Sequence, residues 1–412
     1  MSEYTVQTGD TFDLISRKVY GVETNATALA AANPGLYEPL TAGVSIITPP
    51  QAGAPQDKPP STPFTDENEV TIAINNKVFR FWTTFNVLQQ LDGMSTFTFN
   101  APLTPDDPDF RASFAPFQYQ DIQISVGADR LFTGTLISVQ PDVTAEAKVV
   151  TVSGYSRPGV INDCTPFAPD DSYQLEFNNA NIVDIAQGIM QPFGIRAIGG
   201  AGAPGAIFER VAIQPDGNIL NFFTTLAQQR GLVIASDPFG SLLFRRAESE
   251  GPIVVTLAEG SIPLLSVAPQ FNQQGYFSHV SGIEPVYAGT RGSSFTVKNE
   301  RLKTATRPHT FIVRDAETGE VEEAVKAKAG RMFANVVAYT VTLNTWRDPS
   351  GALWAPNTLI DLTAPGAMIF EEYTFLIRTV SFNKSAASET ATLNLIIPGS
   401  FSGEIPETLP WD

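Results

Sequence analysis

The chain has 412 residues, and its 43 Asp and Glu against 26 Lys and Arg give a formal net charge of −17. Clustered Lys and Arg are what neutralise phosphates, so this balance argues against sequence-specific nucleic-acid binding and against docking on an anionic membrane. The single cysteine, Cys164, excludes an internal disulfide and a cysteine-based zinc cluster, and 31 Gly, 31 Pro and 28 Phe favour short strands and turns.

The first 50 residues predict a small module of strand, helix, helix and strand. Alternation begins at Tyr4, and Thr11 can cap a helix with Ile15 on its apolar face. A second short helix stops at Asn33, and residues 44–47 form the closing strand. The N-terminus lacks the apolar stretch of a signal peptide, and no segment of the chain approaches the roughly 20 apolar residues of a membrane helix.

This module resembles the LysM family. The residues that carry the resemblance are Tyr4, Val6, Gly9, Asp10, Thr11, Ile15, Asn33, Pro34, Leu40, Gly43 and Ile46. LysM domains bind N-acetylglucosamine polymers through two loops, which implies a candidate site at Gly9, Asp10, Thr11, Phe12, Asn33, Pro34, Gly35, Leu36 and Tyr37. The alternative is that these residues only form turns and caps, and that the module docks on a neighbouring protein.

Residues 51–66 form a proline-rich linker that should be extended and semi-rigid. After it, residues 67–158 predict an all-β unit, with a hairpin turn at Asn75 and Asn76. Apolar and polar residues alternate again over 121–127, 131–140 and 148–155, as they would around a small barrel.

The middle region, residues 159–250, predicts a mixed α/β domain. Asn181 can cap one helix, and either Asp216 or Asn218 can cap a second that ends at Gly231. Residues 232–246 then predict a hairpin.

From residue 251 to 412 strands return, with one helix near residues 322–334 and a C-terminal tail. The three strand segments that follow Pro116 reappear in the same order and spacing after Pro356. This internal repeat suggests one barrel used twice. Two similar units per chain would make six in a trimer, which lets a threefold object meet a sixfold one.

No constellation of residues predicts catalysis, a metal or a cofactor, so we expect a protein that is not an enzyme. His279 and His309 lie far apart in sequence without acidic partners. Residues 200–205 match a dinucleotide-binding glycine pattern, but a strand rather than a helix follows them. The acidic residues 106–109 lack the glycine and glutamate of an EF-hand loop.

Three stretches together resemble the baseplate hub protein of Mu-like contractile-tailed phages. They cover residues 152–165, residues 181–231, and residues 346–358, whose two tryptophans we interpret as core packing in a hairpin. The resemblance implies a mainly β (α+β) fold: two tail-tube-like barrels (67–158 and 251–412) flank the middle domain (159–250), after the βααβ module.

The same resemblance implies a structural protein of the virion tail baseplate, assembled in the host cytoplasm. Hubs of this family are homotrimers that join the tail tube protein to the central spike protein, and the type VI secretion spike shares their plan. The LysM-like module would then contact baseplate wedge or sheath proteins. The alternative is a peptidoglycan-binding tail protein, with or without cell-wall hydrolysis.

The net charge acquires a meaning in such a ring. We expect Asp and Glu on the inward faces of the barrels, where they would repel DNA or let a tape-measure protein slide past.

Overall fold

The computed structural model describes residues 2–20, 26–33, 36, 40–48, 67–145, 148–168, 173–284, 292–313, 321–401 and 408–412. The chain divides into two compact units, Met1–Thr65 and Asp66–Asp412. The linker expected at residues 51–66 lies outside the described residues. The fold is mainly β, as predicted.

The first unit has the predicted strand, helix, helix, strand order. Its elements are β1 (Ser2–Thr5), α1 (Phe12–Tyr20), α2 (Ala26–Ala32) and β2 (Ser45–Thr48). Strand β1 starts two residues before the expected Tyr4 and pairs antiparallel with β2. The oxygen Oγ1 of Thr11 accepts a hydrogen bond from Leu14 N (3.2 Å), so the predicted helix cap is confirmed.

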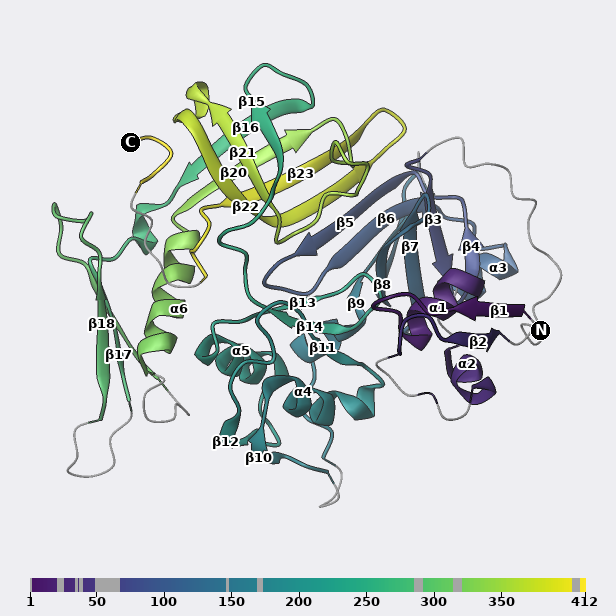
Figure 1. The fold of residues 1–412 in the computed structure, drawn as a ribbon. Helices are drawn as coiled ribbons and strands as arrows, with labels where there is room; N and C mark the ends of the chain where they lie inside the picture. The colour runs from purple at the N-terminus through teal and green to yellow at the C-terminus, as the bar shows by residue number, and fades with distance from the viewer. Residues whose placement is uncertain are drawn as a thin grey trace. The chain divides into compact units, whose positions relative to one another are not determined.

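A 13-stranded sheet dominates the second unit (Figure 1). Its N-terminal part contains β3 (Val70–Ile74), β4 (Lys77–Phe79), β5 (Thr84–Gln90), β6 (Thr96–Pro102), β7 (Asp121–Val126), β8 (Asp129–Val143) and β9 (Lys148–Ser156). Its C-terminal part contains β15 (Ile253–Ala258), β16 (Leu264–Phe271), β20 (Val337–Leu343), β21 (Leu359–Ala364), β22 (Ile369–Lys384) and β23 (Glu389–Ile396). The turn between β3 and β4 uses Asn75 and Asn76 in the left-handed region, as the hairpin signal predicted.

The region between these two parts is mixed α/β. It contains the short helix-like η2 (Arg157–Asn162), β10 (Glu176–Ala180), α4 (Ile182–Met190), β11 (Ala197–Gly199), β12 (Phe208–Ala212), α5 (Ile219–Gln229), β13 (Val233–Ser236) and β14 (Leu242–Arg245). Asn181 caps α4 and Asn218 caps α5, which confirms the first cap and decides between the two candidates for the second. Gly231 follows α5 with a φ of +62°, a conformation that favours glycine.

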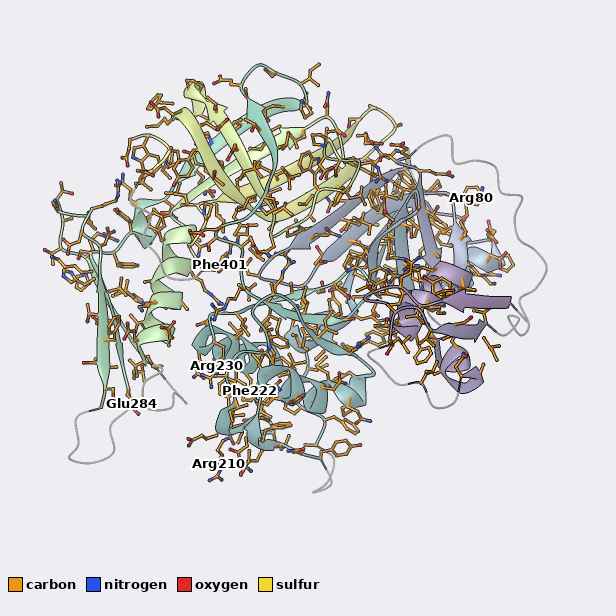
Figure 2. The ribbon with its side chains drawn as sticks, in the orientation of Figure 1. Arg80, Arg210, Phe222, Arg230, Glu284 and Phe401 are labelled. Carbon is orange, nitrogen blue, oxygen red and sulfur yellow. The ribbon has the colours of Figure 1, made fainter. Side chains whose placement is uncertain are left out.

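The C-terminal part carries an insertion, of which the sequence predicted the helix but not the separate sheet. Strands β17 (His279–Ile283), β18 (Ser294–Lys298) and β19 (Pro308–Ile312) form a separate sheet. Helix α6 (Val321–Ala334) packs on it, and Gly282 allows the close approach because a Cβ there would lie 2.3 Å from a methyl group of Val325. Beyond β23, the buried Phe401 lies near α6, 5.8 Å from the guanidinium of Arg331 (Figure 2).

Candidate interaction surfaces

In the LysM-like module, two of the proposed site residues hold the module together. The Asp10 carboxylate is buried and accepts hydrogen bonds from Lys18 Nζ (2.7 Å), Gln7 N (2.8 Å) and Tyr4 Oη (2.9 Å). The hydrogen bond from Lys18 holds the pKa of Asp10 below its ordinary value. The amide of Asn33, also buried, donates to Leu29 O and Ile47 O and accepts from Ile47 N.

The other proposed site residues divide between the core and the surface. Phe12 is buried in the core of the module and Leu36 packs against that core. Gly9 is exposed with a φ of +87°, and Thr11 caps α1. Pro34, Gly35 and Tyr37 lie outside the described residues. Glycan binding by this module therefore stays a prediction, with Gly9 and Thr11 as its accessible described members.

The internal repeat predicted after Pro116 and Pro356 is confirmed by strand pairing. Strands β7, β8 and β9 pair in chain order, and β21, β22 and β23 do the same. The pairing of β8 with β9 skips Ile137, and the pairing of β22 with β23 skips Arg378 at the equivalent place. A shared bulge fixes the alignment residue by residue, because it sets the register of both strands.

The repeat is longer than the sequence indicated. Strand β6 pairs with β9 as β20 pairs with β23, and β5 pairs with β6 as β16 pairs with β20. We call β5–β9 the first repeat, and β16 with β20–β23 the second repeat. In this alignment β8 is equivalent to β22 and β5 is equivalent to β16.

The two repeats join directly, through an antiparallel pairing of β22 with β5. Residues 379–384 pair with residues 85–90, and Leu91 N donates to Arg378 O (2.8 Å) just beyond them. The guanidinium of Arg378 forms two hydrogen bonds with the Asp92 carboxylate, at 3.1 and 2.9 Å. We call this pairing the internal junction.

Trp346 packs against the internal junction. Its ring centroid lies 5.9 Å from that of Phe85 on β5 and 5.7 Å from that of Phe382 on β22. Its indole N–H donates to Thr390 O (2.9 Å), and Trp354 is buried nearby with its own N–H satisfied by Thr345 O. Core packing of both tryptophans, as we interpreted them, is confirmed.

The face of the sheet opposite the core carries an uncharged polar row at its centre. Its side chains on neighbouring strands follow one another across both repeats. One such row is Ser138, Ser153, Thr98, Asn86, Asn383 and Thr390. The Asn86 amide donates to Ser381 Oγ and Asn383 Oδ1 (both 2.7 Å), so these groups satisfy one another across the internal junction. This row offers hydroxyl and amide groups and no charge.

The two histidines, the glycine-rich segment and the acidic segment are all parts of ordinary local structure. His279 Nδ1 lies 3.0 Å from Ser278 Oγ, and the ring of His309 packs on Phe277. A strand, β12, follows residues 200–205, as expected. Asp107 caps the short helix α3 (Pro108–Ser113). In the described parts of the chain, no group of His, Cys, Asp or Glu could hold a metal ion, and no helix has both the length and the apolarity of a membrane span.

Comparison with known proteins identifies the class to which this fold is similar. Residues 159–246 match the family model of the second domain of gp44-like baseplate hub proteins. The baseplate hub protein gp44 of Escherichia phage Mu is 21% identical in an alignment of 310 residues that covers 72% of this chain and 79% of that protein.

Two solved structures share the fold. The 43 kDa tail protein of prophage MuSo2 from Shewanella oneidensis superposes with a TM-score of 0.68 at 23% identity, over 81% of this chain and 99% of that chain. The tail protein from Neisseria meningitidis MC58 superposes with a TM-score of 0.69 at 17% identity, over 81% and 98% of the two chains.

The chain thus has the fold of phage tail proteins. The resemblance to the baseplate hub proteins of Mu-like phages is confirmed, and the protein is a structural component of a tail baseplate and of a virion.

Proposed function

We propose that this protein is the hub of a contractile tail. Three copies form a pseudo-sixfold ring that joins the sixfold tail tube to the trimeric central spike, and the protein catalyses no reaction. The observation that carries the proposal is the internal repeat. Two equivalent strand sets in one chain, joined edge to edge in one sheet, are what a threefold ring needs in order to present six similar units.

Mass photometry of the purified chain, followed by pull-down with the tube and spike proteins of the same virus, tests the proposal. The expected result is a trimer that retains both proteins. A strict monomer that binds neither would contradict it.

The polar face of the sheet is the surface we propose for the passage. Its central row is rich in hydroxyl and amide groups, and the acidic lining that the net charge suggested stays a prediction. Neutral groups that satisfy one another bind neither phosphate nor peptide strongly, which suits a passage for a tape-measure protein or DNA.

For the LysM-like module we propose docking on a baseplate wedge or sheath protein. The hydrogen bonds of Asp10 and Asn33 support this, because both side chains bind other groups of the module. Sedimentation of the full chain with insoluble peptidoglycan tests the alternative of glycan binding. Retention of the chain would favour the glycan, and its absence would favour docking on protein.

A further inference from the structure

Both repeats carry a strand edge at the same place, but only one of these edges is covered. At the internal junction, residues 379–384 of β22 are covered by β5. The equivalent residues of β8, 138–143, pair only with β9 among the described strands, and β16, the equivalent of β5, pairs only with β20. One chain therefore has two unused edges that correspond to the two halves of an existing contact.

We propose that β16 of a second copy of this chain lies along residues 138–143 of β8, and that this contact closes the ring. The inference rests on the proposed trimer and names the surface that forms it. The contact is heterologous, since two different surfaces meet, and such a contact closes into a ring when its rotation allows. The internal junction already shows that the two strand types fit side by side.

The register follows from the alignment of the repeats. Val380 pairs with Gln89 at the internal junction, and their equivalents are Val139 and Phe271. Moving along the strands in this register gives three pairs on the core face: Val139–Phe271, Pro141–Pro269 and Val143–Val267. It gives three pairs on the opposite face: Ser138–Asn272, Gln140–Gln270 and Asp142–Ala268.

Chemical complementarity supports this register, which was fixed by geometry alone. Every pair on the core face is apolar, and this face of the unused edges exposes 62% of Val143 and 39% of Phe271. Four of the six residues on the opposite face carry hydroxyl or amide side chains, so these four continue the row of hydroxyl and amide groups across the contact; the other two are Asp142 and Ala268. A shift of one residue would set apolar side chains against polar ones, because neighbouring residues point to opposite faces.

A cavity beside the β8 edge fits the residue that follows β16. At the internal junction, Leu91 follows β5 and is fully buried in a cluster with Leu359, Leu376 and Ile396. The equivalents of these three residues are Asp121, Thr135 and Tyr155, and all of them line a cavity of about 620 Å³.

The equivalent of Leu91 is Gln273, which is exposed in this chain. The apolar Leu91 thus fills an apolar pocket, and the polar Gln273 of a second copy would enter a cavity whose wall includes polar groups. Burying a polar group is tolerated where it gains hydrogen-bond partners, and Asp121 and Thr135 offer them.

Two prolines make the new contact weaker than the internal junction. Leu91 N donates to Arg378 O, and because backbone groups alternate sides along a strand, Phe382 also points its backbone toward β5. The equivalents of Phe382 and of its partner Val87 are Pro141 and Pro269, which have no N–H. The ladder is therefore open at its centre, and the free edges resist pairing with unrelated strands before assembly.

Disulfide trapping in the full chain tests the contact. In a Cys164→Ser background, Gln140→Cys and Gln270→Cys place two thiols at a pair whose Cα atoms should lie about 4.5 Å apart, within reach of a disulfide. Both side chains are exposed, so the chain should fold normally. Oxidation should shift the chain from one-chain to three-chain mobility on a non-reducing gel.

The matched control combines Gln140→Cys with Ser266→Cys, four residues out of register and about 13 Å further along the strand. It should stay at one-chain mobility. Equal cross-linking of both pairs, or linkage beyond three chains, would overturn the register or the closed ring. A trimer in mass photometry without cross-linking would overturn this contact and leave the hub proposal standing, whereas a monomer would overturn both.

Discussion

The two repeats share a strand order and a bulge but differ in what fills their edges. At the bulge of the second repeat, Arg378 is bound by Asp92, whereas its equivalent in the first repeat, Ile137, is 40% exposed. The strand beyond the bulge is buried or half-buried in the second repeat and mostly exposed in the first. A duplicated scaffold can thus keep its backbone plan while one copy forms a contact within the chain and the other leaves an equivalent surface open.

The same difference is visible in the turn before β7 in the first repeat and the turn before β21 in the second. Asn357 and Phe117 both follow a proline and both have positive φ values, of 73° and 63°. The Asn357 side chain accepts a hydrogen bond from Glu248 N (2.8 Å) and so ties the second repeat to the middle region. Phe117 is 91% exposed. An exposed aromatic side chain in a conformation that bulky residues avoid indicates a surface under a constraint other than folding.

The largest effect should come from removing the tryptophan that packs on the internal junction. Trp346→Ala deletes a fully buried ring and the hydrogen bond to Thr390 O. We expect a loss of about 3–5 kcal/mol in the free energy of unfolding, measured by urea denaturation. Trp82→Ala is the matched control: its ring also lies near Phe85 but is only partly buried, so it should cost clearly less. Equal losses would mean that the internal junction does not depend on Trp346.

The next effect compares Leu91, which fills a pocket at the internal junction, with its equivalent Gln273, which is exposed. Leu91→Ala should lower the free energy of unfolding by about 3 kcal/mol, because it empties a fully buried position in an apolar cluster. Gln273→Ala at the equivalent position should leave the unfolding of the monomer unchanged and weaken self-association in a dilution series. If Gln273→Ala destabilised the monomer as much as Leu91→Ala, the equivalence of the two positions would be wrong.

A smaller effect compares the two bulges. Arg378→Ala should cost about 2 kcal/mol, because it leaves the half-buried Asp92 carboxylate without its partner. Ile137→Ala at the exposed bulge should change the free energy of unfolding by less than about 0.5 kcal/mol. The double variant Arg378→Ala with Asp92→Ala completes the cycle, and recovery of part of the loss is the expected sign of a direct pair.

The sequence predicted the order of elements well where local chemistry decides it. The caps at Thr11 and Asn181, the turn at Asn75 and the repeat after Pro116 all depend on residues close in sequence. The internal junction joins segments almost three hundred residues apart, and nothing in the alternation of β5 or β22 identifies its partner. Similarly, Asp10 and Asn33 matched a binding motif, yet their hydrogen bonds within the module depend on the folded positions of Lys18 and Ile47.

The smallest effect concerns a hydroxyl that distinguishes equivalent core positions. Tyr339 in the second repeat corresponds to Phe97 in the first, and both rings are buried. Among the described residues the Tyr339 hydroxyl has no hydrogen-bond partner, and burial raises its pKa to about 12. Tyr339→Phe should therefore be neutral or stabilise the fold by up to about 1 kcal/mol, while Phe97→Tyr should cost about 1–3 kcal/mol.

The pKa of Tyr339 also predicts the pH dependence of this pair. The unfolded hydroxyl loses its proton near pH 10 and the folded one near pH 12. The free energy of unfolding is therefore independent of this group below about pH 10 and falls as pH rises from about 10 toward about 12. Urea unfolding between pH 9 and pH 12 should show a shallower decline for Tyr339→Phe than for the parent chain. Part of the decline should remain in Tyr339→Phe, because burial also raises the pKa of Tyr373, to about 12. An identical slope in the two proteins would show that the Tyr339 hydroxyl reaches water, and that the second repeat tolerates it at no cost.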